Sequence, residues 1–184
     1  MQHRIWKILK IFANIGLISL GWIMIFELND SLFGQFSHSI RAHWIFLPAG
    51  FRPIIILLFD KVGAAGLVLG GYLTVMGTTG GDEGHAAMLS VILGATPWLA
   101  VSIGKRILPI PSDLSGLTPR HIISVCVLCS TFNAVLLNGY LWIAGRLTGG
   151  AIQIATVFVG DLFGSAIVMF LLSTILVLLL PKRS

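Results

Sequence analysis

One carboxylate lies in the most apolar part of the chain, where a charge is least expected. Asp161 belongs to Gly160-Asp161-Leu162-Phe163-Gly164, well inside a predicted membrane helix. An ionisable group in such a helix is costly, and it marks either a functional site or a buried, paired group. Both interpretations stay open. In the second, Asn133 or Asn138 is the expected hydrogen-bond partner.

A second charge occurs where an apolar segment is broken. Arg52 ends the run Trp44-Ile-Phe-Leu-Pro-Ala-Gly-Phe-Arg52, which contains a proline and a glycine and is followed by Pro53. Proline interrupts a helical ladder, and a bilayer tolerates the break only where protein or water satisfies the freed groups. We expect Arg52 near the outer surface, where it either reaches the headgroups or turns inward to Asp161 or an anionic ligand.

The two charges are predicted to differ in depth. A rise of 1.5 Å per residue places Asp161 about 15 Å below the outer end of its helix, so a direct pair would need a long reach or a bridging ligand. The predicted ligand-binding residues are Trp44, Pro48, Gly50, Arg52, Asn133, Asn138 and Asp161.

Small and polar residues suggest how the helices pack. Cys126, Ser130 and Asn133 share one helix face, which is either a packing surface or one wall of a ligand cavity opposite Asp161. Glycines spaced four apart allow close helix packing, and the two predicted pairs are Gly66 with Gly70 and Gly160 with Gly164. Histidines and acids in the predicted outer loops have no diagnostic ligand spacing, so we expect no metal site and no cofactor.

Composition places the chain in a membrane. Of its 184 residues, 56% are hydrophobic and 10% are charged, against about 25% charged in soluble domains. We predict an all-α, polytopic helix bundle that forms a single domain over 1–184, with the lipid bilayer as its main partner. The net charge of +5 is not read as a nucleic-acid signal, because the basic residues lie in loops and at the chain ends.

About six membrane helices are predicted, over 5–28, 44–59, 62–77, 86–103, 119–144 and 151–180. The apolar region 44–76 is divided in two because one helix would bury Asp60 and Lys61 in lipid. Thr118 is the predicted N-cap of the fifth helix, with Pro119 in the first helical position.

The charge distribution predicts the orientation. With six spans and both termini cytoplasmic, nine basic residues fall inside and three outside, in agreement with the positive-inside rule. The inner set is Arg4, Lys7, Lys10, Lys61, Lys105, Arg106, Arg120, Lys182 and Arg183, and the outer set is Arg41, Arg52 and Arg146.

Two segments resemble the MASE family of membrane-associated sensor domains. They are Trp44 to Phe59, with its Leu47-Pro48-Ala49-Gly50 core, and Gly160-Asp161-Leu162-Phe163-Gly164 with the helix that follows. The resemblance implies a sensory module of the bacterial inner membrane. The six-helix plan also looks like the substrate-capture subunit of energy-coupling-factor vitamin transporters, which would place a ligand site near the outer face.

These features favour a non-enzymatic sensory or accessory subunit of the bacterial inner membrane. Such a subunit would bind a small ligand, or another membrane or signalling protein, within its helices. The alternatives are a substrate-binding subunit of a vitamin-type transporter and a structural subunit of a larger complex. An enzyme is not expected, because no reactive constellation of side chains is visible.

Overall fold

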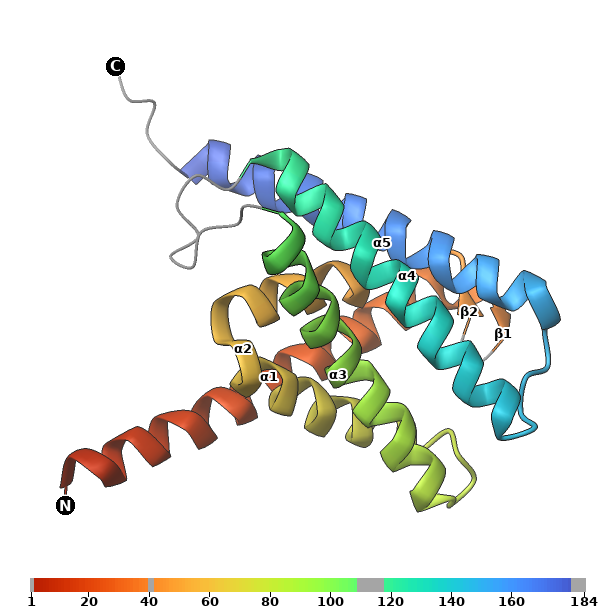
Figure 1. Ribbon diagram of the computed structural model, residues 1–184, viewed down its shortest axis with the longest axis horizontal. Coiled ribbons are helices and arrows are strands. Elements are labelled where there is room, and N and C mark those ends of the chain that lie inside the picture. The colour runs from red at the N-terminus through yellow and green to blue at the C-terminus, as the bar shows by residue number, and fades with distance from the viewer. Residues whose placement is uncertain (1, 40–41, 109–117, 180–184) are drawn as a thin grey trace.

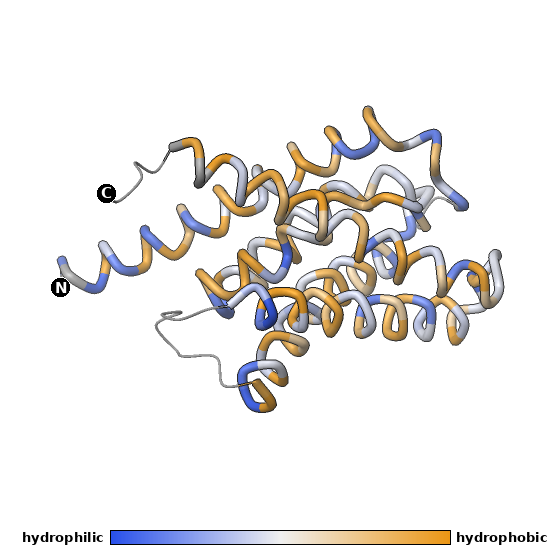
Figure 2. Tube along the Cα trace, turned by 90° about the horizontal axis from the view of Figure 1, so that it is seen from above, coloured by the Kyte–Doolittle hydropathy of each residue, from blue (hydrophilic) through white to orange (hydrophobic). Residues whose placement is uncertain are grey.

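The computed structural model describes residues 2–39, 42–108 and 118–179, and these residues are mostly helical (Figure 1). The elements are α1 (Gln2–Phe33), a short 3₁₀ turn η1 (Gly34–Phe36), β1 (Ser37–Ser39), β2 (Ala42–His43), α2 (Pro48–Met76), α3 (Glu83–Ile107), α4 (Pro119–Ile143) and α5 (Gly150–Leu179). All five α-helices are long and apolar enough to cross a membrane. Apolar residues run along most of each helix (Figure 2), as the predicted all-α class requires.

The number of helices differs from the sequence prediction. Where two helices were expected over 44–59 and 62–77, the structure has one element, α2, so the described residues form five helices and not six. The break itself is present, because Asp60 leaves helical geometry at φ 47° and ψ −124°. No loop separates the two halves, and the helix bends at this single residue. The indole Nε1 of Trp98 donates a hydrogen bond of 2.8 Å to Asp60 Oδ1 at the bend.

The bend at Asp60 folds α2 back on itself. A straight helix of this length would separate its ends by roughly 40 Å. Instead, the ring of Trp22 packs 6.3 Å from that of Phe46, just before α2, and its Nε1 bonds to Thr74 near the end of α2. A Cβ at Gly63 would lie 2.8 Å from the carbonyl oxygen of Ile55. The two halves therefore run in opposite directions, as two short helices would.

A non-helical segment enters the bundle before α2. We call residues 43–47 the entry segment. It begins at the last residue of β2 and runs along the middle of α5. Its backbone is bonded at several points: Trp44 N to Phe36 O (3.1 Å), Phe46 N to Gly160 O (3.1 Å) and Leu47 N to Asn29 Oδ1 (2.8 Å). Backbone that leaves a helix in an apolar region needs such partners.

The buried core joins four of the helices. Trp22 of α1, Ile56 and Leu67 of α2, Val101 of α3 and Val125 of α4 are each at most 1% exposed. Ile56 and Leu67 come from opposite halves of α2, so the core itself holds the fold-back closed. The predicted cap of α4 is confirmed, because the Thr118 side chain accepts a hydrogen bond from His121 N.

The fold-back places the start of α1 and the end of α5 on one side. The start of α1, the end of α3, the start of α4 and the end of α5 lie toward one end of the bundle (Figure 1). The β-hairpin, the α2–α3 connection and the α4–α5 connection lie toward the other, which we call the loop end. Because α2 reverses direction at Asp60, the five helices run between the two ends of the bundle an even number of times. Arg41, Lys182 and Arg183 lie outside the described residues.

This arrangement predicts the labelling pattern of single cysteines in sealed vesicles. His38→Cys and Gly77→Cys should react with a membrane-impermeant thiol reagent from one side, and Arg106→Cys should react from the other. The reason is that the fold-back returns the end of α2 to the side on which it began. A straight α2 would instead place positions 38 and 77 on opposite sides. The native Cys126 and Cys129 are buried and serve as the unlabelled background.

Candidate functional site

The centre of the bundle holds a buried ion pair. Asp161 on α5 is 2% exposed and Arg52 on α2 is 3% exposed. Arg52 Nη2 lies 2.8 Å from Asp161 Oδ2, and the Asn133 side-chain amide of α4 donates a second hydrogen bond of 2.8 Å to the same oxygen. Three helices that are distant in sequence therefore meet at one carboxylate oxygen. Of the two amides expected as partners, Asn133 is the one that binds Asp161.

Of the two alternatives for Arg52, the structure has the inward contact with Asp161, and the predicted separation of the two charges does not hold. Arg52 was expected near the outer surface, separated from Asp161 in depth, and the structure joins the two directly. The entry segment explains the difference, because it carries the chain to the middle of α5 before α2 begins. Gly50 at the start of α2 already lies against Ser165 and Val168 of α5. A rise of 1.5 Å per residue places Arg52 correctly only if its helix begins at the surface.

Two glycines of α5 make room for the entry segment. A Cβ at Gly160 would collide with the His43 carbonyl oxygen, and a Cβ at Gly164 would collide with the Phe46 carbonyl oxygen. These glycines were predicted to form a helix-packing face, but they contact the non-helical backbone of the entry segment. By contrast, Gly66 and Gly70 do lie against a helix, with Ile18 beside the first and Trp22 beside the second.

One aromatic ring lies beside the guanidinium and packs against two others. The Arg52 Cζ atom lies 5.6 Å from the centre of the Phe46 ring, within the range of a cation–π contact. Phe46 also packs edge-on to Phe26 at 6.3 Å and stacks on His43 at 5.5 Å. Burial lowers the pKa of His43 below its usual value, and the nearby Asp30 carboxylate partly opposes this shift.

A cavity of about 100 Å³ adjoins the ion pair. Every helix and the entry segment contribute to its wall. The lining residues are Phe26, His43, Phe46, Arg52, Thr74, Val75, Thr78, Leu89, Ile92, Leu93, Asn133, Leu137, Val157 and Asp161. Thr78 lies two residues beyond the end of α2, so the cavity extends from the ion pair toward the loop end. An apolar pocket with a few convergent polar groups is the usual form of a small-molecule site.

Three of the predicted ligand-binding residues line this cavity: Arg52, Asn133 and Asp161. Trp44, Pro48, Gly50 and Asn138 do not. Trp44 is 44% exposed, and Pro48 and Gly50 are buried where α2 begins. Asn138 donates to the backbone oxygen of Ala134 in its own helix, which turns its amide away from Asp161.

Sequence reasoning missed most of the wall. Phe26, His43 and Phe46 were assigned to a membrane helix, a loop and the start of a span, without a shared role. Thr74 and Thr78 carry the one signal that was available, because residues four apart share a helix face. That face acquires meaning only once α2 folds back and returns to Arg52.

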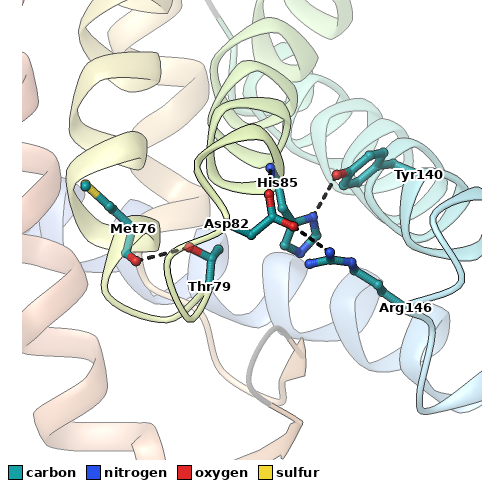
Figure 3. A network of polar contacts seen from close by, with 6 residues as sticks. All are labelled: Met76, Thr79, Asp82, His85, Tyr140 and Arg146. Atoms are coloured by element: carbon teal, nitrogen blue, oxygen red, sulfur yellow. Dashed lines mark hydrogen bonds and ion pairs between the residues drawn. The ribbon is translucent and has the colours of Figure 1, made fainter.

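A second polar network ties the connections at the loop end (Figure 3). Asp82, the N-cap of α3, accepts a hydrogen bond from His85 N (2.9 Å) and pairs with Arg146 at 2.6 Å. His85 Nδ1 shares a hydrogen bond of 2.7 Å with the Tyr140 hydroxyl of α4, and Thr79 donates to the Met76 carbonyl oxygen. These contacts join the α2–α3 and α4–α5 connections near the Thr78 end of the cavity.

Within the described ranges, no three histidine, cysteine or acidic side chains gather where a metal ion could bind. Asp82 and His85 instead belong to the loop-end network, and His43 stacks on Phe46. Cys126 and Cys129 are buried in α4 with free thiols.

Comparison with known proteins found no matching family model, no matching curated protein and no matching solved structure. The site is therefore interpreted from its own residues.

The ion pair predicts strong coupling between its two charges. Arg52→Gln or Asp161→Asn alone should lower the free energy of unfolding by about 3–5 kcal/mol, because each leaves an unpaired buried charge. The double variant should lose clearly less than the sum of the two. Unfolding in mixed micelles at increasing denaturing detergent would measure these losses. Arg146→Gln, which breaks an exposed pair, is the control and should cost much less. Additive losses at 52 and 161 would show that the two charges act independently.

The loop-end network predicts a pH dependence. The His85 backbone N–H and then the Arg146 guanidinium hold the pKa of Asp82 below its usual value. A carboxyl with a lower pKa in the folded state stabilises the fold above its unfolded-state pKa, and this contribution disappears as pH falls through the folded pKa. Wild type should therefore be more stable than Asp82→Asn at pH 6, and the difference should shrink as pH approaches 3.

Melting temperatures across this pH range would test the expectation. Glu83→Gln removes a neighbouring exposed carboxylate and is the matched control. An Asp82→Asn difference that stays constant with pH would show that the cap acts without its charge.

Proposed function

We propose that this chain is a non-enzymatic membrane protein that binds a small molecule in its central cavity. In this proposal it acts as a sensory or accessory subunit. The observation that carries the proposal is the cavity itself, which is lined by all five helices and has a buried ion pair in its wall. A ligand there would contact every helix at once, so its binding can change how the helices pack.

The lining chemistry supports binding over catalysis. Its polar side chains are a guanidinium, a carboxylate, an amide, two threonines and a histidine, and no lysine, serine or cysteine lines the cavity. Both threonine hydroxyls donate to carbonyl oxygens of α2. Arg52 and Asp161 neutralise each other. Such groups orient a ligand, whereas an activated nucleophile requires an adjacent base.

The proposed location is the bacterial inner membrane, with both termini in the cytoplasm. Arg4, Lys7 and Lys10 begin α1, and Lys105 and Arg106 end α3, at the same end of the bundle. A concentration of basic residues on one side supports a cytoplasmic position for that side. The loop end would then face outward, with the Thr78 end of the cavity.

The folded-back α2 favours a second candidate, a substrate-binding subunit of a small-molecule transporter. Interrupted helices that end in the middle of the membrane are typical of transporter sites. Uptake of a ligand into vesicles that depends on a partner protein would distinguish this candidate from a sensor, which binds and retains its ligand.

Filling the cavity tests the shared core of both candidates. Val75→Trp places an indole in the lining, whereas Leu73→Trp places it on the 54% exposed face of the same helix. We expect wild type and Leu73→Trp, purified in lipid nanodiscs, to carry the same small molecule in native mass spectrometry. Val75→Trp should carry roughly tenfold less, because the indole occupies the site. If no small molecule accompanies wild type, or if both variants carry it equally, the proposed function is wrong.

A further inference from the structure

We propose that the cavity selects an electrically neutral amphiphile. Its ligand would have an apolar body about the size of one aromatic ring and one uncharged group that both donates and accepts hydrogen bonds. This inference rests on the proposed ligand-binding function and names the chemical class of the ligand.

The formal charges in the cavity wall balance each other. Among the described residues that line the cavity, Arg52 supplies the one guanidinium and Asp161 the one carboxylate, and the two neutralise each other. Burial lowers the pKa of His43, which disfavours a positive charge there. A charged ligand would enter a poorly solvated site that offers no counterion of its own, and the cost of removing that charge from water would not be recovered. A neutral ligand avoids this cost.

The ion pair leaves hydrogen-bonding groups of both side chains unused. Both contacts to Asp161 end at Oδ2, so its Oδ1 accepts no hydrogen bond from the described residues. Arg52 uses Nη2 for the ion pair, and its Nε is enclosed by protein without a partner among them, so the terminal guanidinium nitrogens are the donors that can face a ligand. A guanidinium offers five N–H donors, and a carboxylate accepts at both oxygens. A ligand group placed beside this pair therefore meets donors and acceptors together, as a hydroxyl or a carboxamide requires.

The rest of the cavity wall is apolar. Eight of the fourteen lining residues are aliphatic or phenylalanine, and they come from all five helices and the entry segment. The volume of about 100 Å³ is somewhat smaller than that of an engineered apolar cavity of about 150 Å³ that takes up benzene. The cavity is not fully enclosed, which adds room for a ring that carries one substituent.

Three probes of one size test the proposal: benzyl alcohol, benzoate and benzylammonium at pH 7. They share a ring and differ in charge. We expect wild type in nanodiscs to bind benzyl alcohol with a dissociation constant roughly tenfold lower than that of either ion. Ligand-observed NMR, with protein-free nanodiscs of the same lipid subtracted as background, would measure saturable binding, and Val75→Trp would show whether it occurs in the cavity.

Variants of the ion pair should redirect this preference. Asp161→Asn leaves the guanidinium unpaired, so benzoate should gain roughly tenfold relative to benzyl alcohol. Arg52→Gln leaves the carboxylate unpaired, so benzylammonium should gain by a similar factor. Asp82→Asn, which removes a charge outside the cavity, should leave the order of the probes unchanged. Should a variant fail to fold, the comparison of the three probes on wild type still decides the question.

The outcomes separate this inference from the proposed function. If an ion binds to wild type as tightly as the alcohol, the neutral class is wrong, while the cavity remains a binding site. If no probe binds saturably, the proposed ligand class is wrong, and the molecule that co-purifies with wild type decides the proposed function by itself. If Val75→Trp binds the probes as well as wild type, both proposals fail.

Discussion

The buried ion pair between Arg52 and Asp161 constrains much of this structure. Neither charge is stable alone in an apolar interior, so the fold must deliver both to the same point and hold them there. Asp161 needs only a helix that passes through the bundle. Arg52 needs a chain that enters the bundle before its helix begins, and Asn133 must come from a third helix to bond the same carboxylate oxygen. The pairing thus links α2, α4 and α5.

The entry segment meets the demand on Arg52, and it imposes demands of its own. Backbone outside a helix lacks the helical partners of its N–H and C=O groups, and an apolar environment supplies no others. Asn29 and the Gly160 carbonyl bond two of its N–H groups, and the absence of side chains at Gly160 and Gly164 lets it lie directly on α5. The fold-back at Asp60 then returns α2 to the loop end. The cavity lies between the two halves of α2, the entry segment and the other helices.

This geometry connects packing to the proposed function. A molecule in the cavity would lie against the ion pair at one end and near the loop-end network of Asp82, His85 and Arg146 at the other. The first region fixes how α2, α4 and α5 meet, and the second fixes the connections between helices. A bound ligand could therefore change helix contacts in the interior and the conformation of the loop end, where a partner protein could bind. A binding subunit needs that property, whether its output is a signal or a delivered substrate.

The sequence by itself determined the class of the protein, and the tertiary structure decided the site. Long apolar segments with few charges can form only helices in a bilayer, so the all-α class and four of the helix positions followed from composition and periodicity. Asp60 also showed where α2 would be interrupted, because a charge in an apolar helix is costly, but the predicted start at residue 44 lies four residues before the observed start at Pro48. The pairing of Arg52 with Asp161 could not be predicted in the same way. It depends on how deep the entry segment runs along α5, and that depth is fixed by contacts between residues more than a hundred positions apart. Rise per residue measures distance along one helix, whereas only the packed bundle shows where that helix starts.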